Sequence, residues 1–212
     1  LSFLESEAKR NARAGGEDLL VLGTHVFDTL RYFAGDPQWC WADIRMEGRR
    51  AELKDARPAT EPVGSVLGDA INAMYGFGNG IVGYFASVKT TEGNQGRWGI
   101  DLYGTKGVVT IRIDTIPQAY VVMDPSWAPG GKTDASWTPL PGAPVVEMKD
   151  RAKEPNAPII RDLVAAIRED RRPRISLQDG RASLEMIQAV YAAHLGGKPV
   201  TFPLENRRPL LA

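Results

Sequence analysis

A histidine and an aspartate stand three residues apart in a segment that is otherwise largely apolar. His25 and Asp28 lie between Glu17 and Ala34, a stretch with the residue spacing of one long helix. Residues three apart on a helix are neighbours, so the carboxylate can orient or polarise the imidazole. A histidine held in this way can move protons near neutral pH, which is general acid–base chemistry.

The same pair has less specific explanations. On residue types alone, a solvated polar helix face or a buried histidine with satisfied hydrogen bonds is the commoner reason for such a pair. A metal site at His25 and Asp28 is a third alternative, but no third ligand follows at a suitable spacing, so we expect no metal.

The helix that carries this pair has two distinct faces. A glycine pair, Gly15-Gly16, precedes it, and Gly35 offers a left-handed stop at its end. Five apolar residues at helical spacing predict the buried stripe: Leu19, Leu22, Val26, Leu30 and Phe33. The opposite face carries Asp18, Val21, His25, Asp28 and Tyr32.

The rest of the chain reads mainly as strands joined by short turns. Alternation of apolar residues predicts strands over 39–47, 69–77, 81–88, 97–103, 108–113, 119–123 and 200–204. One further helix begins near 155–158, and a last one runs over 180–195 with Leu184, Ile187 and Tyr191 facing inward. Hairpins between neighbouring strands predict an α+β fold, in which a large, mostly antiparallel open sheet has its helices on one face.

Two segments between these elements leave alternatives open. The polar stretch 49–68 is either a plain surface insertion or a flap that faces the substrate. Trp127 and Trp137 stand in a segment rich in Pro and Gly, where they could stack on a sugar, seal a subunit contact or pin the loop to the body. His194 falls near the end of the last helix and is interpreted as structural.

One glycine-rich motif has the residue types and spacing of a dinucleotide-binding fingerprint but not the expected secondary structure. Residues 78–83 read Gly-Asn-Gly-Ile-Val-Gly, the spacing of a dinucleotide-binding turn. That fingerprint requires a following helix, whose N-terminus holds the pyrophosphate. Here the next residues, 84–88, read as a strand, and Asn79-Gly80 is a strong hairpin turn. We therefore expect no cofactor at this motif.

Composition narrows the class of protein. The 212 residues include 43% hydrophobic and 25% charged residues, which are ordinary globular values. With 26 basic and 26 acidic residues the net charge is zero, which argues against nucleic acid or an anionic membrane as partner. The single cysteine, Cys40, allows no internal disulfide and suits a reducing, cytoplasmic location; it reads as a small buried hydrophobe. Neither a signal peptide nor an apolar run of about 18 residues is visible.

Taken in order, the motifs resemble the C-terminal domain of the Gfo/Idh/MocA oxidoreductases, the family of glucose-fructose oxidoreductase and inositol dehydrogenase. The resemblance rests on the glycine pair followed by Gly23-x-His25-x-x-Asp28, and on the segments 83–87, 100–107, 179–191 and 199–204. It covers nearly the whole chain.

The resemblance implies a substrate-binding and oligomerising domain of an NAD(P)-dependent enzyme acting on a sugar, polyol or related hydroxy compound. NAD or NADP would be bound mainly by an N-terminal nucleotide-binding domain, to which residues 1–14 would be the linker helix, with 15–212 forming the α+β domain. The 212-residue chain alone would then be inactive. The open sheet face would build a homo-dimer or tetramer.

The resemblance also implies site residues. His25 would exchange the proton of the substrate hydroxyl and Asp28 would orient it, while Asp18, Tyr84 and Arg97 are candidate substrate contacts. Two departures from the family pattern stand out. Val21 occupies the place where members often carry an aspartate, which favours a non-catalytic binding or scaffold module as the alternative. The family's Glu-Lys-Pro lysine has no counterpart, because 153–155 read Lys-Glu-Pro in another region.

Overall fold

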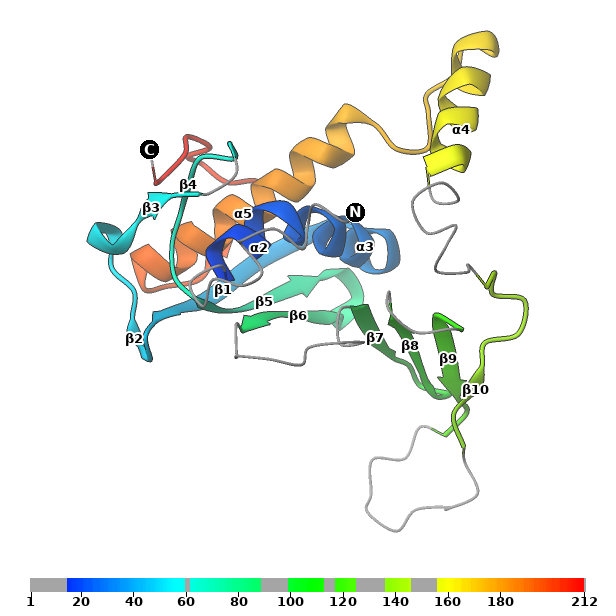
Figure 1. The fold of residues 1–212 in the computed structure, drawn as a ribbon, viewed down its shortest axis with the longest axis horizontal. Coiled ribbons are helices and arrows are strands. Elements are labelled where there is room, and N and C mark those ends of the chain that lie inside the picture. The colour runs from blue at the N-terminus through cyan, green and yellow to red at the C-terminus, as the bar shows by residue number, and fades with distance from the viewer. Residues whose placement is uncertain are drawn as a thin grey trace. The chain divides into compact units, whose positions relative to one another are not determined.

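The fold consists of two compact units in the chain (Figure 1). The computed structural model describes residues 15–59, 62–88, 99–112, 117–124, 136–145 and 156–211. The first unit comprises residues 1–91 and 175–212, and the second comprises residues 92–174. The predicted linker helix over 1–14 lies outside the described residues.

The first unit is built on a five-stranded antiparallel sheet. Its strands follow the order β11-β1-β5-β6, and β2 pairs with the end of β1. The elements of this unit are α2 (Gly15–Val21), α3 (Gly23–Ala34), β1 (Pro37–Met46), β2 (Arg49–Arg50), η2 (Leu53–Asp55), β3 (Arg57–Pro58), β4 (Ser65–Val66), β5 (Ala70–Phe77), η3 (Gly78–Gly80), β6 (Val82–Val88), α5 (Leu177–Gly196) and β11 (Val200–Thr201). Strands β3 and β4 form a separate two-stranded sheet.

Alternation along the strands divides the large sheet into a helix-covered face and an open face. Cys40, Ala42, Ile44 and Met46 of β1 are buried, whereas the intervening residues are half-buried or exposed. The odd-numbered residues of β5 continue the buried face. Helices α2, α3 and α5 lie over this face in Figure 1. The predicted fold class, α+β with antiparallel strands and helices on one face, is confirmed.

Aromatic rings fill the space between the helices and the sheet. Phe27 of α3 packs edge-to-face on Tyr75 of β5, with ring centroids 5.4 Å apart, and lies 4.8 Å from Phe85 of β6. The Tyr75 hydroxyl donates a 3.0 Å hydrogen bond to the Met186 carbonyl of α5. Cys40 lies in the same core, and burial raises the pKa of its thiol to about 12, as expected of a small buried hydrophobe.

The hairpin predicted at Asn79-Gly80 is confirmed. Both residues have positive φ, at 60° and 74°, which the tight turn requires. The residues that follow form strand β6 and not a helix. The glycine-rich match therefore has no helix N-terminus that could hold a pyrophosphate.

The second unit contains a four-stranded antiparallel sheet and one helix. The strands are β7 (Gly99–Tyr103), β8 (Val108–Arg112), β9 (Ala119–Val122) and β10 (Thr138–Pro139), in the order β10-β9-β8-β7. Nη2 of Arg112, on β8, donates to both carboxylate oxygens of Asp101, on β7, at 2.7 and 2.8 Å. The helix, α4 (Asn156–Arg168), begins where it was predicted.

Several sequence-based expectations about burial are wrong. Phe27 is fully buried and was not placed in the stripe, whereas Phe33 is 46% exposed. The buried residues Leu19, Gly23 and Phe27 follow one another at intervals of four. The buried face of the helix therefore differs from the predicted one. The stretch 49–68 is not only surface, because it contains short strands and the buried Ala51, Val66 and Leu67. Leu184 is 53% exposed, although Ile187 and Tyr191 are buried as expected.

Helix α5 starts one turn earlier than predicted because Ser176 caps it. The Ser176 hydroxyl accepts the Asp179 amide N–H, and the Asp179 carboxylate accepts the Ser176 amide N–H at 2.9 Å. These reciprocal bonds satisfy two backbone donors at the helix start.

Replacing Ser176 by alanine should destabilise the chain by about 1 kcal/mol, the usual loss for an N-cap. Urea unfolding of the 212-residue chain measures this value. Leu177→Ala is the matched control, since Leu177 is exposed at the next position and caps nothing. Equal stability of Ser176→Ala and the parent would contradict the role of the cap.

Candidate active site

The helix that carries His25 is interrupted one turn before it. The Thr24 hydroxyl donates a 2.8 Å hydrogen bond to the Val21 carbonyl. The His25 amide donates instead to the Leu22 carbonyl, at 3.1 Å, three residues back. This local tightening separates α2 from α3, where the sequence predicted one continuous helix over 17–34.

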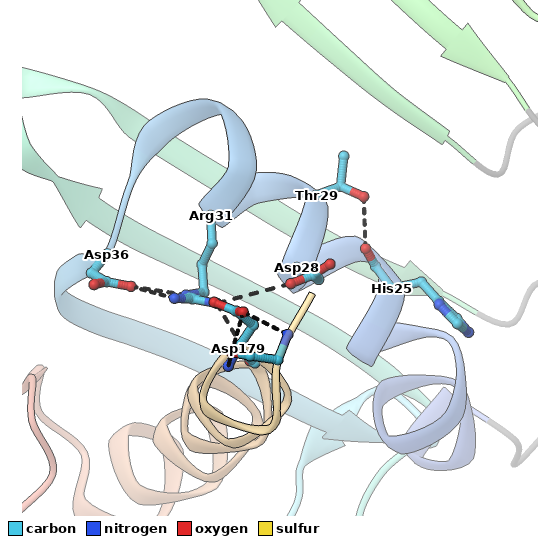
Figure 2. Close-up of polar contacts among 7 residues, drawn as sticks. His25, Asp28, Thr29, Arg31, Asp36 and Asp179 are labelled. Carbon is cyan, nitrogen blue, oxygen red and sulfur yellow. Dashed lines mark hydrogen bonds and ion pairs between the residues drawn. The ribbon is translucent and has the colours of Figure 1, made fainter. Parts of the chain in front are cut away.

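His25 is exposed on the surface of α3. Its backbone carbonyl accepts a 2.7 Å hydrogen bond from the Thr29 hydroxyl, which supports the backbone under the imidazole. Figure 2 shows the imidazole and the Asp28 carboxylate pointing away from each other. The ring is therefore accessible to a ligand, and in this structure the predicted carboxylate does not orient it.

Asp28 instead belongs to an ion-pair cluster around Arg31. The Arg31 guanidinium lies 3.9 Å from the Asp28 carboxylate and 2.7 Å from that of Asp36. It also reaches Asp179 at the start of α5, 3.5 Å from the carboxylate and 3.3 Å from the carbonyl oxygen. Figure 2 shows the three carboxylates converging on this one cation, which is only 15% exposed. The cluster ties the end of α3 to the start of α5.

Sequence reasoning missed Arg31. The pair Asp28 and Arg31 stand three apart on a helix with opposite charges, a spacing that favours contact. That signal was present and competed directly with the pairing of Asp28 and His25. Neither Asp36 nor Asp179 had a comparable signal in the sequence. Asp179 is distant in sequence, and the fold alone brings its carboxylate close to Arg31.

Asp18 lies half-buried on α2, at the far end of the same helical segment. Its carboxylate accepts a 3.5 Å hydrogen bond from the Ser87 hydroxyl at the end of β6. Val21, the residue at the family's aspartate position, is half-buried in the following turn. Asp18 is thus the carboxylate that α2 brings towards the edge of the sheet.

Tyr84, another candidate substrate contact, does not lie beside His25. Tyr84 is 74% exposed on β6 and faces away from α3, since its neighbour Phe85 is the residue that packs on Phe27. Arg97 lies outside the described residues. Tyr84 belongs to the open face of the sheet.

The open face carries an apolar depression of about 620 Å³. It is lined by Trp39, Trp41, Met74 and Pro199. The Trp39 indole lies against Gly76, where a Cβ would meet its ring. This depression and His25 are on opposite faces of the sheet, because Trp39 and Trp41 alternate with the buried Cys40 and Ala42.

The described part of the chain supplies neither a metal cluster nor a membrane span. Among those residues, no group of three or more His, Cys, Asp or Glu side chains is placed to hold a metal ion. No described helix is long and apolar enough to cross a bilayer.

Comparison with known families explains the order of the motifs. The family model for the oxidoreductase family, C-terminal alpha/beta domain (GFO_IDH_MocA_C) matches residues 5–202. This chain belongs to the Gfo/Idh/MocA oxidoreductase family. The resemblance inferred from the sequence is thereby confirmed. No curated protein matches the chain.

Solved structures of similar fold include several oxidoreductases. Levoglucosan dehydrogenase in complex with NADH and levoglucosan is 20% identical with a TM-score of 0.60, over 90% of this chain and 51% of that one. An NAD-binding protein from Listeria innocua is 18% identical with a TM-score of 0.55, over 87% and 47%. Aldose-aldose oxidoreductase from Caulobacter crescentus, complexed with glycerol, is 22% identical with a TM-score of 0.54, over 85% and 46%. The chain therefore spans about half the length of these Gfo/Idh/MocA-like structures.

Proposed function

We propose that this chain is the substrate-binding and oligomerisation domain of an NAD(P)-dependent oxidoreductase acting on a sugar, a polyol or a related hydroxy compound. Family membership supports the oxidoreductase class. Two of the similar structures named above were solved with NADH and levoglucosan or with glycerol, which supports a hydroxylated substrate. The observation that carries the proposal is the exposed imidazole of His25, unpaired with Asp28.

His25 would act on the proton of the substrate hydroxyl. In the oxidative direction the imidazole takes the O–H proton while the carbon loses a hydride and the C–O bond becomes a carbonyl. The hydride acceptor would be a nicotinamide held by residues outside this chain, since the glycine-rich turn at 78–83 lacks the helix that a pyrophosphate needs. In the reductive direction the protonated imidazole returns the proton.

Asp18 and Asp28 would assist from the same helical segment. Asp18 could accept a hydrogen bond from a substrate hydroxyl, because its carboxylate already accepts one from the Ser87 hydroxyl. Asp28 could orient His25 only by moving away from Arg31. The cluster around Arg31 therefore holds the proposed pair apart in this structure.

The oligomerisation role rests on the open face of the sheet. Strand register places Trp41 beside Met74, and Met74 beside Tyr84. Pro199, the residue before β11, lines the same depression as Trp41 and Met74. This row of large apolar groups, which crosses β1, β5 and β6 and ends at Pro199, is called the Trp41 row. It is a surface that a soluble sheet rarely leaves uncovered. A second copy of the chain would cover it.

The assay for the enzymatic role uses the full-length protein. We expect at least one member of a panel of sugars and polyols to reduce NAD or NADP. The absorbance of the reduced nicotinamide measures this reaction. The 212-residue chain alone should give no turnover under the same conditions. Turnover absent from the full-length protein with every hydroxy compound would contradict the proposal.

A non-catalytic binding or scaffold module is the second candidate function. It is favoured by Val21, an apolar residue where members of the family often carry an aspartate. In that case the full-length protein would bind both NAD(P)H, seen as a shift in its fluorescence, and a polyol without converting either one. That result would support the module over the enzyme.

A further inference from the structure

Beside strand β1, at the end of its pairing with β2, an imidazole takes the place of a backbone hydrogen bond. Antiparallel pairing of β1 with β2 joins Arg45 to Arg50 and Met46 to Arg49. The next pair in this register is Ile44 and Ala51, and the Ala51 amide donates to the Ile44 carbonyl at 3.0 Å. The reciprocal bond, from the Ile44 amide to the Ala51 carbonyl, is replaced by the side chain of His194.

The two nitrogens of His194 bridge the gap in fixed roles. The Ile44 amide N–H donates to Nδ1 at 3.0 Å. Nε2 lies 2.8 Å from the Ala51 carbonyl oxygen, to which it can only donate. The neutral imidazole with its proton on Nε2 therefore satisfies both backbone groups, and no other protonation state does. We call this arrangement the His194 bridge.

The surroundings of the bridge disfavour a second proton. His194 is fully buried. The charged groups near it are Arg50, whose guanidinium donates to the His194 carbonyl oxygen, and Asp43 and Arg45 of β1. Burial lowers the pKa of His194, and the Arg50 charge lowers it further, against the opposing effects of the Ala51 hydrogen bond and Asp43. The two hydrogen bonds of the bridge therefore fit a neutral imidazole.

We propose that the His194 bridge is an acid-sensitive latch that joins the end of α5 to the β1–β2 edge of the sheet. A proton added to Nδ1 would point at the Ile44 N–H, so that two donors would face each other. The ring would have to leave its place, and Ile44 and Ala51 would lose their partners. The latch is closed at neutral pH, and its opening becomes more favourable as the pH falls.

The sign and size of the effect follow from proton linkage. A histidine in an unfolded or opened segment titrates near its ordinary pKa of about 6.5, whereas the closed bridge excludes the proton. Stability from the bridge is therefore complete above that value and is lost as the pH falls below it. Between pH ~7.5 and ~5.5 the equilibrium constant for opening should rise about tenfold.

The chain offers a matched control, because its two histidines are His25 and His194. Urea unfolding of the 212-residue chain is measured at both pH values for the parent, for His194→Gln and for His25→Gln. Glutamine can accept from Ile44 and donate to Ala51 but does not titrate in this range. We expect the tenfold change in the parent and in His25→Gln, and a change below about threefold in His194→Gln. A His194→Gln variant that keeps the parent's pH dependence would overturn the latch.

A local measurement on the parent decides the matter even if His194→Gln does not fold. Hydrogen exchange of the Ile44 amide, corrected for intrinsic rates, reports opening of the bridge itself. Its protection factor should fall about tenfold between pH ~7.5 and ~5.5, in step with the opening constant. Unchanged protection of Ile44 over this range would overturn the proposal.

Discussion

If the proposed function holds, replacing His25 by alanine in the full-length protein is expected to lower kcat by ~10²–10⁴, the usual contribution of a general acid or base. The fold should survive, because His25 is exposed. The substrate KM should change much less than kcat, since the lost group acts on the reacting proton. Steady-state kinetics of the parent and the variant measure both constants.

Two controls separate proton transfer from damage to the helix. Tyr32→Ala removes an 83% exposed side chain from the same helix and should keep the parent rate. Imidazole added to His25→Ala should restore part of the lost rate, because it can carry the missing proton. A His25→Ala rate within about threefold of the parent would remove His25 from the acid–base role.

The Asp28→Asn variant tests whether the aspartate shares that role. In the structure the Asp28 carboxylate lies beside Arg31 and not beside the imidazole. We therefore expect a smaller loss of kcat than in His25→Ala. A loss equal to that of His25→Ala would mean that Asp28 leaves Arg31 and orients the imidazole during the reaction.

Replacing Trp41 by glutamate is expected to dissociate the oligomer. Trp41 is 42% exposed at the centre of the Trp41 row, between Met74 and Pro199. A central tryptophan of an interface is often worth ~2–4 kcal/mol, and the new carboxylate would be buried there without a partner, so the dissociation constant should rise by about 10²-fold or more. Light scattering on the full-length protein, over a range of concentrations, measures the change.

The control for this variant is Leu53→Glu. Leu53 is 55% exposed on the short helix η2, outside the Trp41 row, so the same kind of charge is introduced away from the open face. It should leave the molar mass unchanged. A monomeric parent at micromolar concentration, or a Trp41→Glu variant with the parent's mass, would contradict association through this face.

Local sequence patterns predicted much of the sheet. Alternation from Trp39 onward identified the buried face of β1, because a strand facing helices on one side repeats every two residues. Asn79-Gly80 predicted a turn because both residues tolerate positive φ. The same reasoning rejected the glycine-rich match at 78–83, since the residues after it favour a strand.

Details that depend on distant residues were not predictable in this way. The role of His194 depends on Ile44 and Ala51, which lie more than a hundred residues away in sequence. The sequence placed Asp28 equally near His25 and Arg31, and the cluster with Asp36 and Asp179 favours Arg31.

The most direct test of the proposed function is a structure of the full-length protein with nicotinamide cofactor and a bound polyol. We expect an imidazole nitrogen of His25 to lie within hydrogen-bond reach of the reacting hydroxyl, at about 2.6–3.2 Å or through one water. A bound polyol whose reacting hydroxyl meets other groups, while the His25 ring faces open solvent, would contradict it.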